Sequence, residues 1–300
     1  MNVLGIDIGG SKIAAGIISA DGNILRAEKE RLPAGTTAES LLAVIKSKCD
    51  ILLSESGYGF DRIGVTIPGL ADAENGIWVY APFSGINNFP IAAKLSAMYQ
   101  NRRVFIENDV NACAVGEKRF GCCQNTGDFI WITVSNGIGG SVFANGRLYT
   151  GSSGNAGEIG HIKVSDDTDE DYICGCGDYG CAEAIAAGPG IAKRYKKIAG
   201  APLTAEQIAS EAKSGGSDAQ KVMYDTGYYI GKALAAAINM LNPESVIFGG
   251  GVSQSFDLFE PGVRDALSRY MFKAANKNIK LMRTALAYDA ALIGAAAIAL

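Results

Sequence analysis

One short region of the chain combines the side chains that bind transition metals. It holds His161, the only histidine among 300 residues, and three of the seven cysteines, at Cys174, Cys176 and Cys181. Three thiolates and one imidazole form a complete tetrahedral set of zinc ligands, and the neighbouring glycines permit a tight turn that aims the sulfurs inward. All four coordination positions are then filled by protein, so such a zinc would stabilise the loop rather than activate water.

Two other interpretations of these residues stay open. The cysteines could be ordinary reduced thiols beside a hydrogen-bonded core histidine, but four ligand types at metal spacing are more specific than any one alone. They could form disulfides, but an odd count of seven and the reducing compartment that we expect speak against it. The zinc set is flanked by two acidic residues, Glu158 and Glu183, and closure of the loop could bring their carboxylates toward one cavity.

Two glycine turns that follow apolar strands are candidates for phosphate binding. The first follows a strand expected over residues 3–8, which carries Asp7, and the second follows a strand expected over residues 130–134. Such turns expose backbone amides and have no side chain that keeps a phosphate away, although most glycine turns only reverse the chain. Ile-Gly-Gly-Ser occurs at 8–11 and again at 138–141, which indicates two duplicated halves that could hold a polyphosphate between their turns.

A third glycine turn, Gly249 to Gly251, follows a strand expected over residues 245–248. It could receive the adenosine of a nucleotide, or it could be only a turn from a strand into a helix. The turns at Gly137 and Gly249 both lack the full GxGxxG pattern of dinucleotide-binding proteins, which disfavours a Rossmann dehydrogenase.

A pair of polar residues, Asn108 and Asp109, ends a strand expected over residues 103–107 and precedes a helix. Polar side chains at this position commonly cap the helix. Alternatively, Asp109 is a general base, because open α/β sheets place their ligands at strand ends. Further strands are expected over residues 13–18, 24–27 and 62–67, and helices over residues 38–54, 91–99, 191–199, 204–213 and 219–241.

Composition limits the possible partners and compartments. A chain of 300 residues predicts two domains, and 48% apolar with 19% charged residues is typical of a globular protein. The net charge of -4 and the lack of a basic block make nucleic acid an unexpected partner. We expect no membrane association, because no signal-like run occurs and the alanine-rich stretch 290–300 is about half a membrane span. The expected location is the cytoplasm.

Taken together, the motifs resemble those of the ROK family of sugar kinases and related repressors, in the actin-like ATPase superfamily. The resemblance covers nearly the whole chain in the family's order. The matching segments are Asp7-Ile8-Gly9-Gly10-Ser11-Lys12, Glu107-Asn108-Asp109, Gly137-Ile138-Gly139-Gly140, Gly157 to His161, Cys174 to Glu183, and Leu241 to Glu244 leading to Gly249-Gly250-Gly251.

This resemblance implies an α/β fold of two actin-like, ribonuclease H-like domains with an active-site cleft between them and a zinc-stapled loop. We expect a smaller domain over residues 1–112 and 288–300 and a larger one over residues 113–287. The implied activity is ATP-dependent phosphorylation of a hexose hydroxyl, with glucose favoured over N-acetylmannosamine, allose or another hexose. Homodimers are expected from the family alone. A non-catalytic, sugar-responsive regulator is the alternative, although such repressors carry an added N-terminal helix-turn-helix and here the first hairpin starts at residue 3.

The resemblance also implies roles for individual residues. Asp109 would be the catalytic base, and Asp7 would orient Mg²⁺ through water. The sugar would be bound by Gly69, Asn108, Asp109, Glu158, His161 and Glu183. The structural zinc would be held by His161, Cys174, Cys176 and Cys181. ATP would be bound by Asp7, Gly9, Gly10, Ser11, Lys12, Asn136, Gly137, Gly139, Gly140, Gly249, Gly250 and Gly251.

Three positions depart from the family's pattern. Ser11 replaces a threonine and keeps the hydroxyl group, and Ser141 replaces a common third glycine. Asn136 replaces another threonine, so an amide stands where a hydroxyl near the phosphates is usual. We therefore expect the nucleotide contact at Asn136 to differ from that of the family.

Overall fold

The computed structural model describes residues 1–33, 35–81, 85–166 and 172–300. By packing, the chain divides into two compact units. Unit 1 comprises Met1–Asn125, Thr150–Asn155 and Ala285–Leu300, and unit 2 comprises Thr126–Tyr149 and Ala156–Thr284. The domain limits expected from the family resemblance stay a prediction.

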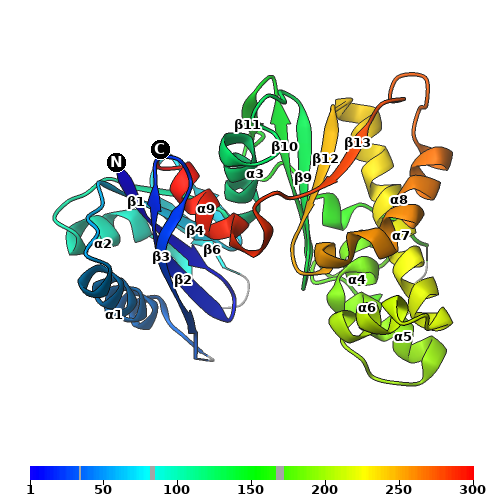
Figure 1. Cartoon of the computed structure of the whole chain (residues 1–300), viewed down its shortest axis with the longest axis horizontal. Coiled ribbons are helices and arrows are strands. Elements are labelled where there is room, and N and C mark those ends of the chain that lie inside the picture. Colours follow the sequence, from blue (N-terminus) through cyan, green and yellow to red (C-terminus); the bar gives the residue numbers. More distant parts are fainter. Residues whose placement is uncertain (34, 82–84, 167–171) are drawn as a thin grey trace. The chain divides into compact units, whose positions relative to one another are not determined.

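Unit 1 is built on a five-stranded mixed sheet in the order β3-β2-β1-β4-β8 (Figure 1). The central strand β1 pairs antiparallel with β2 and parallel with β4, and β4 pairs parallel with β8. Strands β1 and β2 of this sheet are apolar and mostly buried. Strand β3 lies at the sheet edge and carries exposed charged residues. The strands are β1 (Asn2–Ile8), β2 (Lys12–Ser19), β3 (Ile24–Arg31), β4 (Arg62–Ile67) and β8 (Val104–Asn108).

Helices cover both faces of this sheet, as the alternation of side chains along β1 requires. Leu4 and Ile6 point into a core with helix α1 (Ala38–Ser56), whereas Val3 packs against helix α9 (Ala290–Ala297). Helix α9 can approach β4 closely because Gly64 has no side chain. A Cβ at Gly64 would overlap the Ala295 carbonyl group. The same unit contains α2 (Ile91–Met98), α3 (Asp109–Phe120) and a small antiparallel sheet of β5 (Leu70–Asp72), β6 (Ile77–Tyr80) and β7 (Asn87–Phe89).

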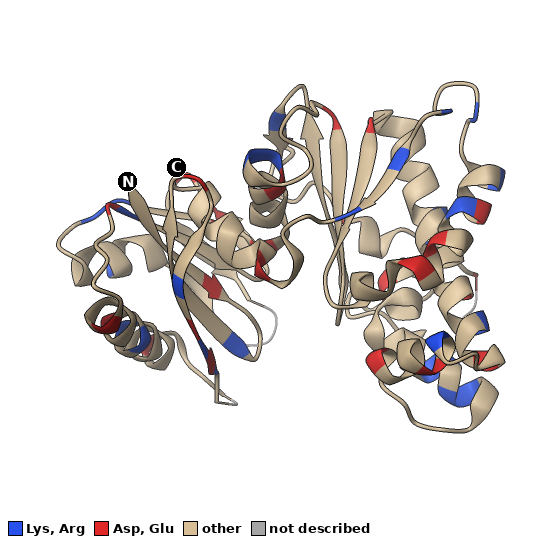
Figure 2. Cartoon of the chain, in the orientation of Figure 1, with Lys and Arg blue, Asp and Glu red and all other residues tan. Residues whose placement is uncertain are grey.

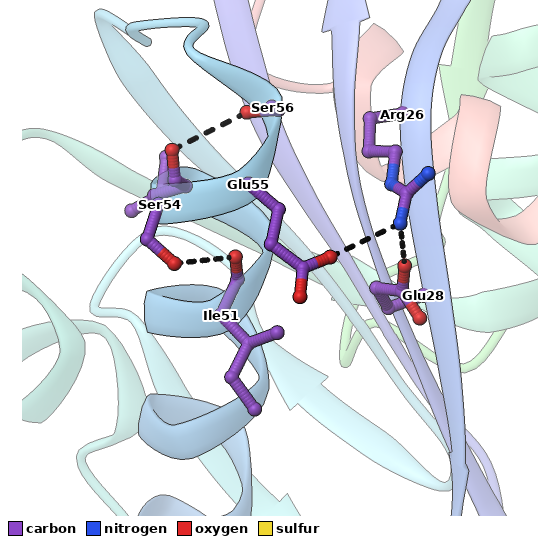
Figure 3. A network of polar contacts seen from close by, with 7 residues as sticks. Arg26, Glu28, Ile51, Ser54, Glu55 and Ser56 are labelled. Carbon is purple, nitrogen blue, oxygen red and sulfur yellow. Dashed lines mark hydrogen bonds and ion pairs between the residues drawn. The ribbon is translucent and has the colours of Figure 1, made fainter.

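Local signals fix the ends of α1. Thr37 and Ser40 form a capping box at its start, and Gly57 ends it with a φ of 67°. Figure 3 shows how the far end of α1 is tied to the edge strand β3: Arg26 contacts Glu28 at 2.8 Å and Glu55 at 3.2 Å. These pairs are exposed, so each contributes only about 0.2–1 kcal/mol, and burial of apolar residues holds the helix in place.

Unit 2 repeats the same strand arrangement, in the order β11-β10-β9-β12-β13. Here β9 pairs antiparallel with β10 and parallel with β12, as β1 does with β2 and β4. The duplication expected from the repeated Ile-Gly-Gly-Ser motif is therefore confirmed at the level of strand order. The strands are β9 (Phe129–Val134), β10 (Ile138–Ala144), β11 (Arg147–Tyr149), β12 (Ser245–Gly249) and β13 (Lys280–Arg283).

One large apolar core joins this second sheet to its helices. Helix α7 packs closely against α8, and glycines at the contact permit this. Cβ atoms on Gly227 and Gly262 would overlap the backbone of the facing helix. Figure 2 shows acidic and basic residues interspersed on α8, as they are on α1. Among the described residues, we find no helix with both the length and the apolar character needed to cross a bilayer. The helices are α4 (Ala182–Ala186), α5 (Gly188–Ala199), α6 (Ala205–Lys213), α7 (Ser217–Leu241) and α8 (Phe256–Tyr270).

The sequence predicted most of these elements to within one to three residues. The strand expected over residues 24–27 is longer and continues to Arg31, because it follows β2 along the hairpin to Lys12. The sequence did not predict α4, α8, α9, β5 to β7, β11 or β13 as separate elements. The helix expected after Asn108 does begin at Asp109.

Candidate active site and metal centre

The four expected zinc ligands lie together in unit 2. Their ligand atoms are all within 4.8 Å of one another. Nδ1 of His161 lies 3.5 Å from Sγ of Cys174, and the sulfurs of Cys176 and Cys181 are 3.8 Å apart. Tetrahedral zinc with bonds of about 2.3 Å to sulfur and about 2.0 Å to nitrogen places neighbouring ligand atoms roughly 3.5–3.8 Å apart. The donor set and its spacing therefore fit zinc.

Backbone hydrogen bonds hold the cysteine loop in this conformation. The amides of Cys174 and Gly177 donate to the carbonyls of Asp178 and Cys174, at 2.8 and 2.9 Å. Gly177 has a φ of 89°, which glycine adopts readily, and this permits the reversal between Cys176 and Cys181. An ion pair of 2.5 Å between Lys163 and Asp178 closes the loop from outside.

The two acidic residues that flank the ligands in sequence also flank them in space. Oε2 of Glu158 lies 3.7 Å from Nε2 of His161, the ring nitrogen that faces away from the cysteines. Oε1 of Glu183 lies 3.7 Å from Sγ of Cys174. The structure thus places Glu158 beside His161 and Glu183 beside Cys174, while a cavity shared by the two carboxylates stays a prediction.

The second glycine turn lies against the same cluster. The other oxygen of Glu183, Oε2, accepts a hydrogen bond of 3.0 Å from the backbone amide of Ile138. A Cβ on Gly137 would lie only 2.6 Å from this oxygen, so a larger residue there would displace the carboxylate. Asn136, which precedes it, is exposed, and Gly139 and Gly140 follow in β10.

The third glycine turn is a turn from strand β12 into a short helix, one of the two expected alternatives. Gly249 ends β12, Gly250 has a φ of 85°, and Gly251 precedes the 3-10 helix Val252–Ser255. A Cβ on Gly250 would lie 2.5 Å from the carbonyl oxygen of Val134, at the end of β9. The second and third turns are therefore neighbours, and a contact with adenosine stays a prediction.

In unit 1, the first glycine turn is a tight connection between β1 and β2. The amide of Gly9 donates to the carbonyl of Lys12 at 2.8 Å, and Gly10 and Ser11 are exposed at the tip. Asp7 lies just before this turn, and its Oδ1 accepts a hydrogen bond of 2.8 Å from the hydroxyl of Thr66. Burial raises the pKa of Asp7, while the Thr66 hydrogen bond and Lys12 oppose the shift.

The structure separates the roles of the Asn108–Asp109 pair. Oδ1 of Asn108 accepts hydrogen bonds from the amides of Val110 and Asn111, so Asn108 caps α3. Its Nδ2 donates to the carbonyl of Gly69 at 3.0 Å, which brings two expected sugar-binding residues together. Helix capping is thus supplied by Asn108, and Asp109 is the first residue of α3.

Asp109 has an unusual electrostatic environment. Burial raises the pKa of its carboxyl group to about 7, and the nearby carboxylate of Asp7 adds to the shift. A carboxyl group that ionises near neutral pH is suited to general base catalysis. Unit 1 therefore places Asp7, Asn108, Asp109 and Gly69 around the carboxyl ends of β1, β4 and β8.

Sequence reasoning missed two residues that support this group. Thr66 is fully buried next to Asp7, and Glu107 accepts hydrogen bonds from the amide of Asn108 and from Nδ2 of Asn111. Thr66 carried no signal in the sequence, because its role depends on the strand register that places it opposite Asp7. Glu107 stood in the matching motif, but no role was assigned to it.

Two sheets of identical strand order, each with a glycine turn after its central strand, define a mixed α/β fold of the actin-like class. The model of the ROK family matches residues 3–300, so the chain belongs to the ROK family. The resemblance seen in the sequence motifs is therefore confirmed.

Relatives with known names fall into two groups. The chain is 31% identical to a glucokinase of Thermotoga maritima, over 99% of this chain and 97% of the relative. It is 30% identical to the DNA-binding transcriptional dual regulator NagC of Escherichia coli, over 77% of this chain but 58% of the regulator. A crystal structure of a ROK family glucokinase from Streptomyces griseus, in complex with glucose and AMPPNP, matches with a TM-score of 0.87 and 29% identity. That match covers 100% of this chain and 99% of the glucokinase chain.

Proposed function

We propose that this protein is an ATP-dependent hexose kinase that converts glucose to glucose 6-phosphate. The single observation that carries the proposal is Asp109, a half-buried residue at the start of α3 whose carboxyl pKa is raised to about 7 by desolvation and by Asp7. The similarity to glucokinases over nearly the full length of both chains supports it.

Asp109 would act as the general base. Its carboxylate would accept the proton of the acceptor hydroxyl as that oxygen attacks phosphorus. Asn108 is held by the carbonyl of Gly69 and by the start of α3, so its amide group is oriented before substrate arrives. A base that is fixed beside a substrate-orienting amide is the arrangement that transfer to a sugar hydroxyl requires.

His161 would serve both zinc and sugar. Its Nδ1 lies among the cysteines, so with zinc bound there the hydrogen must sit on Nε2. That N–H would donate to a sugar hydroxyl or to the adjacent carboxylate of Glu158. Glu158 and Glu183 would accept hydrogen bonds from further hydroxyl groups, which explains why acidic residues gather at an otherwise structural metal site.

The glycine turns and Asp7 would bind the nucleotide. ATP with Mg²⁺ supplies the phosphoryl group, and a hard cation of this kind prefers one or two carboxylates and retains water ligands. Asp7 fits that requirement, since it is a single carboxylate that is fixed by Thr66 and precedes the first glycine turn. The turns at Asn136 to Gly140 and Gly249 to Gly251 would contact the phosphates and the nucleoside from unit 2. We expect the kinase to act in the cytoplasm as a homodimer.

A panel of hexoses and N-acetylhexosamines with ATP and Mg²⁺ tests the proposal. We expect glucose to give the highest kcat/KM and the phosphate to appear on its 6-hydroxyl. Higher turnover of N-acetylmannosamine or allose would change the substrate and leave the kinase assignment intact. If zinc-loaded protein forms no ADP with any of these sugars, the kinase assignment itself is wrong.

The second candidate is a sugar-responsive regulator without catalytic activity. The match to NagC favours it, although the chain spans only 58% of that protein. A regulator of this kind would bind a sugar, as seen by calorimetry, and form no ADP in its presence. Sugar binding without ADP formation would favour the regulator over the kinase, because Asp109 would then not act as a catalytic base.

A further inference from the structure

The backbone of Ile138, in the second glycine turn, is contacted on both its amide and its carbonyl side by the segments that carry the metal ligands. On its amide side, Oε2 of Glu183 accepts the N–H of Ile138 at 3.0 Å. On its carbonyl side, Gly160 lies so close that a Cβ there would overlap the oxygen of Ile138. Glu183 is two residues from Cys181, and Gly160 directly precedes His161.

These two contacts belong to segments that a metal would join. His161 ends the 3-10 helix Ile159–His161, and Cys181 directly precedes α4, whose second residue is Glu183. The amide of Ala182 also donates to the carbonyl of Ile162 at 3.0 Å, which links the same two segments just beyond the ligands. A zinc ion shared by His161 and Cys181 therefore fixes the distance between Gly160 and Glu183, the two sides that enclose Ile138.

Other residues of the second glycine turn also make close backbone contacts with neighbouring segments. A Cβ on Gly157 would overlap the carbonyl group of Gly140, and a Cβ on Gly140 would lie 2.6 Å from the carbonyl oxygen of Gly157. On the other side, the amide of Gly188 donates to the carbonyl of Ser135 at 2.8 Å. The turn is thus bounded over Ser135 to Gly140 by the backbone that precedes His161 and by the start of α5, which follows α4.

We propose that the zinc cluster positions the second glycine turn through the backbone of Ile138, so that zinc occupancy sets the affinity for nucleotide. The metal then has a second role besides stabilising its loop. Glu183 is the residue that transmits it, as a positioning residue that acts through the Ile138 amide. This inference rests on the proposed function only in that the turn binds the phosphates of a nucleotide.

Thermodynamic linkage makes the proposal measurable from both directions. If zinc strengthens nucleotide binding by some factor, nucleotide must strengthen zinc binding by the same factor. We expect a factor of about five to a hundred, which is the usual range of coupling between two sites. The non-hydrolysable analogue AMPPNP with Mg²⁺, in the absence of sugar, keeps sugar binding by Glu183 out of the measurement.

The first experiment compares zinc-loaded protein with protein from which a chelator has removed the metal. Calorimetry should show that metal removal weakens AMPPNP binding at least fivefold. Transfer of zinc to a chromogenic chelator should be slower in the presence of AMPPNP. Hydrogen exchange of the Ile138 amide, measured by NMR, should be at least tenfold faster without zinc. Unchanged affinity together with unchanged exchange of this amide would overturn the proposal.

Two substitutions test the path of the coupling. Glu183→Ala removes the acceptor for the Ile138 amide, so it should bind one zinc per chain yet lose the dependence of AMPPNP affinity on zinc. Glu183→Gln keeps a carbonyl oxygen in place and should retain most of that dependence. If Glu183→Ala still shows the full zinc effect, Glu183 does not transmit it and the proposed path is wrong.

A matched control lies in the metal loop itself. Gly175 is placed between Cys174 and Cys176, and no atom lies within 4 Å of a Cβ built on it. Gly175→Ala should therefore leave both zinc content and AMPPNP affinity unchanged. If zinc-loaded wild-type protein binds no AMPPNP, the kinase proposal fails, and the exchange rate of the Ile138 amide alone then decides whether zinc holds the turn.

Discussion

The hydroxyl group of Thr66 donates a hydrogen bond of 2.8 Å to Oδ1 of Asp7 from the directly opposite position in the adjacent parallel strand. Both side chains lie at the ends of strands that lead to the candidate phosphate and sugar residues of unit 1. This hydrogen bond favours the ionised form of Asp7 and fixes the direction of one oxygen. Thr66 is thereby a positioning residue for the carboxylate that would orient Mg²⁺.

Replacement of Thr66 by valine tests that relationship with almost no change in volume. We expect Thr66→Val to raise the concentration of Mg²⁺ needed for half-maximal activity by about ten- to a hundredfold, because one hydrogen bond to a charged group contributes roughly 1.5–3 kcal/mol. Thr66→Ser keeps the hydroxyl and should stay within about threefold of wild type. Identical Mg²⁺ dependence for the valine and serine variants would contradict the assignment.

The pKa of Asp109 predicts the pH dependence of activity. Burial and the neighbouring Asp7 raise this pKa to about 7, so the base is mostly protonated in acid and ionised above neutrality. The value of kcat/KM should therefore fall about tenfold for each pH unit below about 7. Asp109→Asn should lower kcat by roughly 10²-fold or more. Turnover within tenfold of wild type would show that Asp109 is not the base.

The same shift predicts a change in stability. A carboxyl group with a raised pKa binds more protons in the folded state, so its contribution to stability declines as pH rises from about 4 to about 7 and is constant above. Asp109→Asn removes this cost and should raise the free energy of unfolding at pH 8 by up to roughly 4 kcal/mol. Near pH 4 the variant and the wild type should be equally stable. Urea unfolding at the two pH values measures the difference, and equal stability at pH 8 would show that the pKa is not raised.

The metal cluster predicts a defined zinc stoichiometry. Wild-type protein should contain one zinc per chain by elemental analysis, and Cys181→Ser should lose most of it together with thermal stability. Each kcal/mol lost from the free energy of unfolding should lower Tm by about 2–4 °C in a protein of this size. Cys122→Ser is the control, because Cys122 is exposed and lies outside the cluster. Unchanged metal content in Cys181→Ser would rule out this ligand set.

The close approach of α9 to the first sheet predicts a strong effect of one methyl group. Gly64→Ala should destabilise the protein by about 1–3 kcal/mol or more, since the new Cβ would overlap the Ala295 carbonyl. Gly59→Ala is the matched control, because no atom lies within 4 Å of a Cβ at that position. Denaturant unfolding of both variants provides the measurement. Similar midpoints for the two would mean that α9 can move away at little cost.

Local patterns were sufficient to predict part of the candidate site. The spacing of His161 and the three cysteines identified a cluster whose ligand atoms do lie together, because the loop that joins them is short. The strand before Asp109 and the helix after it were also predictable, because neighbouring residues in the sequence mark both. By contrast, the contact of Glu183 with the Ile138 amide joins residues 45 positions apart, and only the packing of α4 against the turn creates it.

The elements that sequence reasoning missed are those with weak periodicity. Helix α9 consists mainly of alanine and small apolar residues, and seven of its eight residues are buried, so no polar face marks its helical period. Strands β5 and β7 have three residues each, too few to show alternation. The end of β3 is rich in charged residues because it lies at a sheet edge, which hid its strand character.

The position of α9 in the chain has a consequence for synthesis on the ribosome. Leu292 and Ala296 of this helix complete the core around Val3 and Ile18, yet they are translated almost 300 residues later. Until they emerge, a nascent chain exposes that face of its first sheet, whereas unit 2 can complete its own core before translation ends. The unit that contains the N-terminal sheet therefore cannot complete this core until α9 has been synthesised.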